Sequence, residues 1–327
     1  MSTALLIVVG LAMLFGFFNG MRDSSSIVAT MISSRAFHPR AALGVTAVAE
    51  FVGPFLFGTG VAKTIGGDIV QSNVVTLNVL IACLLGALLW SLITWVLSIP
   101  SSSSHSLAGG MIGSVVISAG WEAIKLGGLY KVLIALFVLP LVGFVVGFIV
   151  LRLIYFLAHG ASPNINDFFK GGQLITAVAL AFSHGTNDAQ KTMGIITLGL
   201  IIGNQLDHFE VPIWVILTSA SVMSLGTLFG GWRLIRTLGG KFYKIRPVHS
   251  FAIQLSSAFI VLFASVTGLP ASTTQVVSSS IIGVGSSERL GKVRWGVADD
   301  ILTAWVITIP ASALFSAGIY LLVVYFT

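Results

Sequence analysis

Long apolar runs alternate with short polar stretches along most of this chain. Residues 74–98 and 129–157 are almost entirely apolar, and each exceeds the roughly 20 residues that an α-helix needs to cross a membrane. The strands of a transmembrane barrel would instead alternate over about ten residues, and no such segments occur. The pattern predicts an all-α polytopic membrane protein in which polar stretches either lie at the surface or interrupt the apolar helices.

Composition and charge agree with this prediction. Of the 327 residues, 56% are hydrophobic and 9% are charged, whereas soluble domains carry about 25% charged residues. The net charge of +6 comes mostly from short loops, as expected where basic loops stay in the cytoplasm. We therefore expect contact with the lipid bilayer and no nucleic-acid binding. The single cysteine, Cys83, permits no intrachain disulfide, and the first apolar run lacks the basic leader of a cleaved signal peptide.

The polar interruptions occur twice, in the same order. Residues 19–30 (NGMRDSSSIVAT) are similar to residues 184–195 (HGTNDAQKTMGI). Residues 99–114 (IPSSSSHSLAGGMIGS) are similar to residues 269–285 (LPASTTQVVSSSIIGVG). A duplication with constant spacing indicates an internal repeat. Each half thus contains one motif with an aspartate and one motif rich in proline, serine and threonine.

The two halves, residues 1–160 and 161–327, are predicted to be transmembrane repeats of opposite orientation. Basic loops correspond to acidic or balanced ones, namely 34–40 to 203–210 and 232–246 to 62–73. Because basic loops favour the cytoplasm, equivalent loops lie on opposite sides, which is the inverted-repeat architecture of many secondary transporters. Inversion requires an odd number of crossings per half. Counting gives four long spans, so one polar segment must add or remove a crossing.

The first motif places Asp23 and Asp188 inside the membrane. Intramembrane aspartates are functional candidates by default, and the alternative is that they only pair with neighbouring basic side chains. We expect Gly20 and Gly185 to break the helix at the motif. Such a break exposes backbone groups that bind ions, so the motif predicts broken helices at the substrate site.

The second motif places hydroxyl groups at the start of a helix, with Pro100 and Pro270 in its first turn. Polar residues follow both prolines, at 101–105 and 272–275. Hydroxyls and free N–H groups at a helix start form a neutral cradle for an anion. The alternative is that these side chains only bond the carbonyls of their own helix.

Taken together, the motifs resemble the paired signatures of the inorganic phosphate transporter (PiT) family in its short bacterial form. The resemblance rests on FFNGMRDSSSIVATMISSRA, PSSSSHSLAGGMIGS, FSHGTNDAQKTMGI and LPASTTQVVSSS, and covers essentially the whole chain in order. It implies a secondary transporter of the cytoplasmic membrane that couples phosphate uptake to Na⁺ or H⁺. We expect no enzymatic activity, no cofactor and no resident metal.

The resemblance also implies which residues form the site. Phosphate is expected to bind residues of both motifs: Ser102, Ser103, Ser104, Asn187, Gln190, Ser272, Thr273 and Thr274. The coupling cation is expected at Asp23, Asp188 and Asn19. Glu50, in the second span, is a further candidate for the ion or proton site, and its alternative is a position facing a water-filled vestibule.

Three residues are left without a settled role: Arg22, His105 and Gln275. Arg22 stands where the family usually has Asn or His, and Gln275 is the counterpart of His105 in the first half. Arg22 is expected to act as a built-in cation for Asp23, and the alternatives are direct phosphate binding or an orientation toward a water-filled loop. These departures leave the coupling ion open.

Other functions remain as alternatives. A permease for sulfate or another oxyanion would share the fold, but phosphate carries a proton and can donate a hydrogen bond to Asp188, whereas sulfate has no proton to donate. An intramembrane hydrolase would need Ser104 or Ser183 to meet His105 or His184, yet adjacent residues on a helix point about 100° apart. An anion sensor would need a soluble signalling domain to carry its output, and the sequence shows no such segment. Association into a homo-oligomer is left open.

Overall fold

The computed structural model describes residues 2–162, 164–232, 234–236 and 244–326, and this part of the chain is helical apart from its connections. One isolated β-bridge joins Val70 and Ile124, and the described residues form no strand. The helices are α1 (Thr3–Ser33), α2 (Pro39–Val52), η1 (Gly53–Phe55), α3 (Gly60–Lys63), η2 (Thr64–Asp68), α4 (Leu77–Val96), α5 (Ser103–Ala119), η3 (Trp121–Ala123), α6 (Leu126–Leu157), α7 (Ile165–Ile202), α8 (Ile213–Phe229), α10 (Pro247–Val266), α11 (Thr273–Glu288), η4 (Leu290–Lys292) and α12 (Trp295–Phe326).

The helices have the length and composition of a polytopic membrane protein. Among the described ones, α1, α4, α6, α10 and α12 are long and apolar enough to cross a bilayer. The segments Pro39–Phe55 and Gly60–Asp68 pass the same test only when they are taken together, and they are bent by 72° at the break between them, as in a broken span or a re-entrant loop. The predicted all-α fold with broken helices is therefore confirmed.

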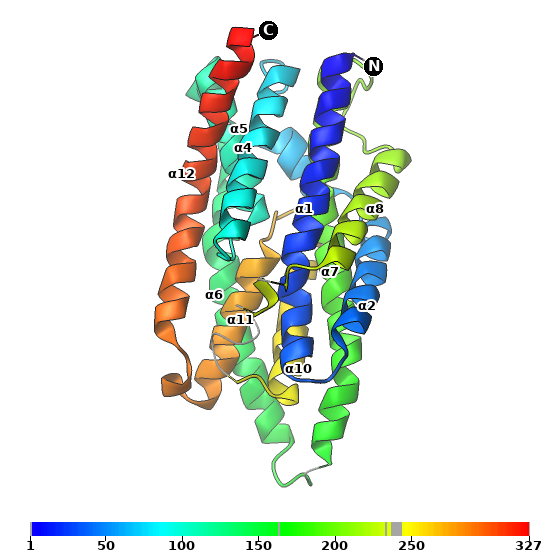
Figure 1. The fold of residues 1–327 in the computed structure, drawn as a ribbon, viewed down its shortest axis with the longest axis vertical. Coiled ribbons are helices and arrows are strands. Elements are labelled where there is room, and N and C mark those ends of the chain that lie inside the picture. Colours follow the sequence, from blue (N-terminus) through cyan, green and yellow to red (C-terminus); the bar gives the residue numbers. More distant parts are fainter. Residues whose placement is uncertain (1, 163, 233, 237–243, 327) are drawn as a thin grey trace.

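Two helix pairs enter the molecule and turn back halfway. In Figure 1, α4 runs from the end that holds both termini to the middle, and α5 returns to that end. From the opposite end, α10 and α11 form the same arrangement. We call α4–α5 the first hairpin and α10–α11 the second hairpin. A hairpin adds no crossing, so one of the four apolar runs counted in each half drops out, and the three that remain are the odd number that inversion requires.

The two halves run in opposite directions. Helix α1 leaves the end that holds the termini, whereas α7 runs toward it (Figure 1). Backbone turns repeat as well: Arg35 and Asn204, which follow α1 and α7, have φ of 58° and 53°. Ser98 and Gly268, in the two hairpin turns, have φ of 59° and 73°. The boundary between residues 160 and 161 stays a prediction.

Each hairpin packs on the last helix of the other half, so the two halves contact each other through both hairpins. Helix α5 lies along α12, and α11 lies along α6. A Cβ on Gly113 would be 2.1 Å from the backbone oxygen of Ala313, and one on Gly283 would be 2.1 Å from that of Phe144. Small residues at these contacts let the helix backbones touch. The two hairpins are thereby held in equivalent positions by equivalent contacts.

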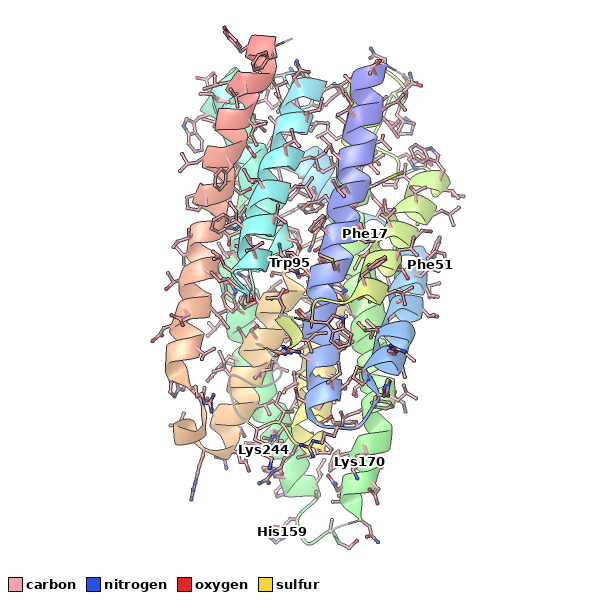
Figure 2. All side chains as sticks on the ribbon, viewed as in Figure 1. Phe17, Phe51, Trp95, His159, Lys170 and Lys244 are labelled. Carbon is pink, nitrogen blue, oxygen red and sulfur yellow. The ribbon has the colours of Figure 1, made fainter. Side chains whose placement is uncertain are left out.

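The charged ends agree with the predicted orientation. His159, Lys170 and Lys244 lie at one end of the molecule (Figure 2), where the loop after α1 also lies. The basic connection after α11 is at this end too. The acidic loop 203–210 is at the opposite end. Of the predicted cytoplasmic loop 232–246, residues 233 and 237–243 lie outside the described residues.

The polar motifs lie between two apolar clusters. One cluster includes Leu5, Leu80 and Leu198, from α1, α4 and α7. The other includes Ile27 and Ile281, from α1 and α11. The layer between them contains the aspartate motifs of α1 and α7 and the turns of both hairpins, and this layer is the candidate site.

Candidate functional site

Both aspartates lie in the middle of unbroken helices. Helices α1 and α7 continue through the first polar motif, so the breaks predicted at Gly20 and Gly185 are wrong. The glycines allow close packing instead: a Cβ on Gly20 would lie 2.0 Å from the backbone oxygen of Met223, and one on Gly185 would lie 2.2 Å from that of Glu50. A continuous helix satisfies its own backbone groups in the membrane, and the chain interrupts its helices at the hairpin turns.

The hairpin helices α5 and α11 begin with matching caps that face the middle of the molecule. Ser102 Oγ accepts a hydrogen bond from the backbone N–H of His105 at 3.2 Å, and Ser272 Oγ accepts one from that of Gln275 at 3.4 Å. The helices therefore start after these serines. The prolines of the motif lie in the preceding turns, not in the first helical turn as expected.

Asp23 lies between the starts of both hairpin helices. Its Oδ2 accepts a hydrogen bond from Ser103 Oγ at 3.0 Å, and its Oδ1 accepts one from Thr274 Oγ1 at 3.1 Å. Arg22 Nη2 lies 3.8 Å from Asp23 Oδ1 and donates to the backbone oxygen of Ser101 at 2.5 Å. Arg22 is 1% exposed, so it does not point into a water-filled loop. One hydroxyl from each hairpin thus meets the same carboxylate.

Asp188 is surrounded more densely. Its Oδ2 accepts a hydrogen bond from Asn19 Nδ2 at 3.1 Å and lies 3.2 Å from His184 Nε2. Its Oδ1 lies 2.8 Å from Lys191 Nζ and 3.5 Å from Thr273 Oγ1. All these side chains are buried. The carboxylate does pair with a basic neighbour, and that pair also faces the second hairpin.

A third carboxylate joins the site through His184. Glu50 Oε1 lies 2.8 Å from His184 Nδ1, and Thr227 Oγ1 donates to Glu50 Oε2 at 2.5 Å. Glu50 is 1% exposed, so it does not face an aqueous vestibule in this conformation. Because the other ring nitrogen of His184 faces Asp188, Glu50, His184 and Asp188 form a continuous polar chain between α2 and α7.

Several predicted residues hold the surrounding backbone and do not touch the carboxylates. Ser104 Oγ donates to the backbone oxygen of Ala271 at 2.8 Å, which connects the two hairpins. Asn187 Nδ2 donates to the backbone oxygen of Leu269 at 3.2 Å. The amide oxygen of Gln190 accepts two backbone N–H groups of α3, at 2.8 and 3.1 Å. These bonds fix the hairpin turns and the broken helix around the aspartates.

His105 and Gln275 occupy equivalent positions in the two hairpin helices. Both are fully buried, and the structure gives the polar atoms of both side chains no partner among the described residues. A buried polar group without a partner costs about 1–3 kcal/mol. These positions therefore offer hydrogen bonds that the described part of the chain leaves unused.

The sequence prediction missed His184 and Lys191 as members of the site. With Asp188 they stand at i, i+4 and i+7, a spacing that places all three on one face of a helix. The signal was thus present in SHGTNDAQK. Thr227, which bonds Glu50 from another helix, carried no such local signal.

The hydrolase geometry is not formed. Ser183 Oγ donates to the backbone oxygen of Ala179 at 2.7 Å, and Ser104 Oγ is bonded to a backbone oxygen of the second hairpin. His184 faces two carboxylates, and His105 has no hydrogen-bond partner among the described residues. A catalytic pair needs the nucleophile and the base within hydrogen-bond reach, so neither serine is activated here.

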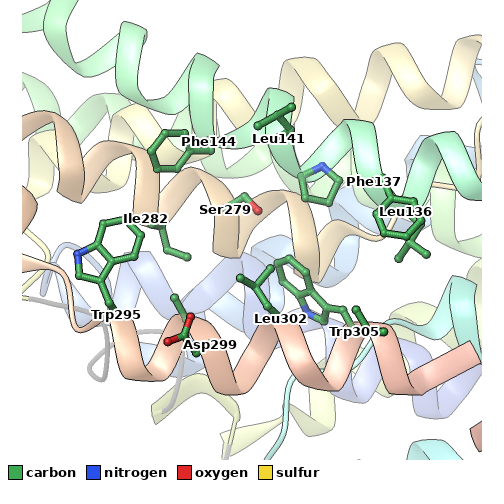
Figure 3. A pocket seen from close by; sticks show the side chains of 13 residues that line it. Leu136, Phe137, Leu141, Phe144, Ser279, Ile282, Trp295, Asp299, Leu302 and Trp305 are labelled. Atoms are coloured by element: carbon green, nitrogen blue, oxygen red, sulfur yellow. The ribbon is translucent and has the colours of Figure 1, made fainter.

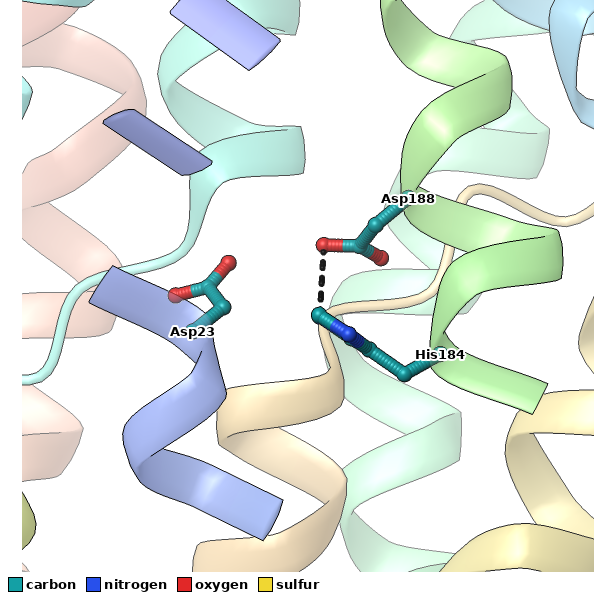
Figure 4. A group of neighbouring side chains, drawn as sticks. All are labelled: Asp23, His184 and Asp188. Atoms are coloured by element: carbon teal, nitrogen blue, oxygen red, sulfur yellow. Dashed lines mark ion pairs between the residues drawn. The ribbon is translucent and has the colours of Figure 1, made fainter. Parts of the chain in front are cut away.

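One oxygen of Asp23, one oxygen of Asp188 and one ring nitrogen of His184 lie within 4.8 Å of one another. Figure 4 shows these three side chains pointing from α1 and α7 into the same space, with the ion pair between His184 and Asp188 drawn as a dashed line. The two repeats therefore bring their carboxylates to a single centre. Two close carboxylates need compensating positive charge, which Lys191 and Arg22 supply.

A surface crevice lies apart from this centre. Side chains of α6, α11 and α12 enclose a cavity of about 410 Å³. Figure 3 shows Phe144, Trp295 and Trp305 around it, with Ser279 and Asp299 as its polar members. None of the predicted site residues lines this crevice, so the buried centre between the hairpins remains the candidate site.

The fold and the site define an integral membrane protein in which two oppositely oriented hairpins meet a buried pair of carboxylates. The sequence model of the phosphate transporter family matches residues 19–316. The chain belongs to this family, as its motifs predicted, and it is a transporter and not an enzyme. Phosphate is the transported substrate of the family.

Relatives and a solved structure agree over the full length. A probable low-affinity inorganic phosphate transporter of Bacillus subtilis is 43% identical over 322 residues, which cover 97% of this chain and 96% of the relative. One of Rhizobium meliloti with the same description is 39% identical, covering 96% and 94%. A structure named the sodium-dependent phosphate transporter superposes with a TM-score of 0.91 over both whole chains at 24% identity, which shows the same fold.

Proposed function

We propose that this chain is a secondary transporter that carries inorganic phosphate across the cytoplasmic membrane together with a coupling cation, Na⁺ or H⁺. The observation that carries the proposal is the meeting of both hairpins at one centre. Ser103 and Thr274, from opposite hairpins, donate to Asp23, while Thr273 faces Asp188. The names of the relatives support phosphate as the substrate.

The site has the groups that this transport requires. The N-terminal ends of α5 and α11 offer free N–H groups and partial positive charge to an anion. The phosphate site then comprises Ser102, Ser103, Ser104, Asn187, Gln190, Ser272, Thr273 and Thr274. A phosphate hydroxyl can donate a hydrogen bond to a nearby carboxylate, and the coupling cation is assigned to Asp23, Asp188, Asn19 and Glu50.

The arrangement of the halves supports alternating access. Each hairpin packs on the last helix of the other half, so rocking of one unit against the other opens the centre to one side at a time. The end with His159, Lys170 and Lys244 is the cytoplasmic side by the positive-inside rule. Phosphate then passes from the acidic loop 203–210 toward this basic end.

Uptake of radiolabelled phosphate into proteoliposomes tests the proposal. A Na⁺ gradient and a pH gradient are imposed separately, and unlabelled sulfate is added as a competitor. We expect accumulation above the external concentration with at least one gradient, and no inhibition by sulfate. Protein-free liposomes are the control. Equal competition by sulfate would replace phosphate with a general oxyanion substrate, and equilibration without accumulation would contradict coupling.

A further inference from the structure

Lys191 gives the second half a positive charge that the first half lacks at the equivalent position. Its side chain is fully buried, and its Nζ lies 2.8 Å from Asp188 Oδ1 and 3.3 Å from Ser103 Oγ. The equivalent residue in the first half is Ser26, which donates to Thr274 Oγ1 at 3.1 Å. The two repeats therefore present a cation in one half and a neutral hydroxyl in the other.

Both oxygens of Asp188 have close polar neighbours. Asn19 and His184 face Oδ2, while Lys191 and Thr273 face Oδ1. Asn19 and Thr273 donate hydrogen bonds to the carboxylate, and the two basic groups lie at ion-pair distance from it, so a cation that bound at Oδ1 would have to displace the amine of Lys191. The amine of Lys191 makes the closest of these contacts.

The geometry of helix α7 holds Lys191 close to the carboxylate of Asp188. Lys191 follows Asp188 by three residues in α7, a spacing that brings both side chains to one face. A buried ammonium needs a partner because an unpaired charge in a dry interior is very unfavourable. In the conformation described, it therefore stays beside Asp188 and carries the same charge as Na⁺.

We propose that Lys191 is a tethered cation that takes the position beside Asp188 that a mobile Na⁺ would need, so that phosphate transport by this chain does not depend on Na⁺. The inference rests on the proposed function, because it selects between the two coupling cations named there. With Na⁺ dispensable, H⁺ is the coupling cation.

The test compares the wild type with Lys191→Ser, which gives position 191 the residue of its counterpart Ser26. Phosphate uptake into proteoliposomes is measured under a fixed pH gradient while Na⁺ is replaced stepwise by choline. Wild-type uptake is expected to be unchanged by the replacement. In Lys191→Ser, Na⁺ is expected to stimulate uptake about tenfold, within the range usual for coupling between two bound ligands.

Two further variants separate the charge from the fold. Lys191→Arg keeps the charge, so its uptake should stay independent of Na⁺ whatever its rate. Lys170→Ser removes an exposed lysine of the same helix that pairs with Asp167, and it should behave as the wild type. If Lys191→Ser does not fold, Lys191→Gln, which removes the charge and keeps a long polar side chain, is measured in its place and should likewise gain stimulation by Na⁺.

The outcomes distinguish this inference from the function on which it rests. A wild type that takes up phosphate only with Na⁺ overturns the tethered cation and leaves phosphate transport intact. Uptake by Lys191→Ser that remains insensitive to Na⁺ overturns it as well. A wild type that takes up no phosphate under any gradient contradicts the proposed function itself.

Discussion

Asp23 and Asp188 occupy equivalent positions in the two repeats, yet their surroundings differ in charge. Asp23 receives two hydroxyls and has Arg22 at 3.8 Å. Asp188 has the Lys191 amine at 2.8 Å and faces the ring of His184 as well. The carboxylates and the hairpin hydroxyls are common to both halves, whereas the basic residues are not. A symmetric frame thus holds an asymmetric distribution of charge.

Arg22 and Asn187 show how an equivalent position can keep one role and gain another. Arg22 donates to the backbone oxygen of Ser101 in the first hairpin turn, and Asn187 donates to that of Leu269 in the second. Both residues tie an aspartate helix to the hairpin of the same half. The guanidinium adds a fixed positive charge to this tie, which the amide does not.

The largest expected effect is that of Asp188→Asn, compared with Asp23→Asn. Removing one partner of a buried ion pair costs about 3–5 kcal/mol, and Lys191 loses its carboxylate at 2.8 Å. We expect driven accumulation of phosphate to collapse in Asp188→Asn while the protein still inserts. Asp23→Asn should lower the thermal stability less, because the nearest basic group is 3.8 Å away. Uptake assays and melting temperatures in detergent measure the two effects.

The double variant Asp188→Asn with Lys191→Gln separates transport from pairing. It removes both charges, so stability should recover relative to the single variant while accumulation stays absent. Normal accumulation in Asp188→Asn would instead show that this aspartate serves only to pair with Lys191.

The next effect concerns the glycines that bring the repeats together. In Gly20→Ala the new Cβ would meet the backbone of Met223, and in Gly185→Ala it would meet the backbone of Glu50. Overpacking of this kind costs about 1–3 kcal/mol. Both variants should therefore melt at lower temperature and give less folded protein.

Each glycine has a matched control in its own helix. A Cβ on Gly10 of α1 or on Gly171 of α7 would have no neighbour within 4 Å. Because alanine favours a helix over glycine by about 1 kcal/mol, Gly10→Ala and Gly171→Ala should not lower the melting temperature. A loss of stability in these controls equal to that of Gly20→Ala would show that the close contact with Met223 does not set the effect.

Much of the fold could be predicted from the sequence, because a membrane restricts which segments can cross it. Apolar length predicted the helices, and charged loops predicted the inversion. The parity of crossings was not accessible, because α4 is apolar enough to span yet turns back after Val96. The prolines and capping serines after it marked a helix start, but a local signal does not tell how deep in the membrane a turn lies.

The site was predicted only in part, for a related reason. Asp23 and Asp188 are charged residues in apolar runs, so composition alone singled them out. The bond between Glu50 and His184 joins α2 and α7, and its partners are set by tertiary packing. The helix breaks predicted at the glycines of the aspartate motif were wrong. A residue without a side chain allows both a break in a helix and close contact between helices, and the sequence does not distinguish the two.

The smallest expected effect is that of Arg22→Asn, which gives the first half the residue that the second half has at Asn187. The guanidinium of Arg22 is turned toward the hairpin turn, where it donates to both oxygens of Ser101. A fixed charge that bound phosphate directly would slow its release, so we predict that Arg22 serves as a built-in cation for Asp23.

Asparagine at position 22 keeps a hydrogen-bond donor for the hairpin turn but removes the charge. We expect Arg22→Asn to acquire a few-fold stimulation by Na⁺, at the low end of ligand coupling, while phosphate is still preferred over sulfate. Uptake measured against Na⁺ concentration, and against phosphate concentration at saturating Na⁺, checks both parts. A large loss of phosphate affinity with unchanged ion dependence would show instead that Arg22 contacts the anion.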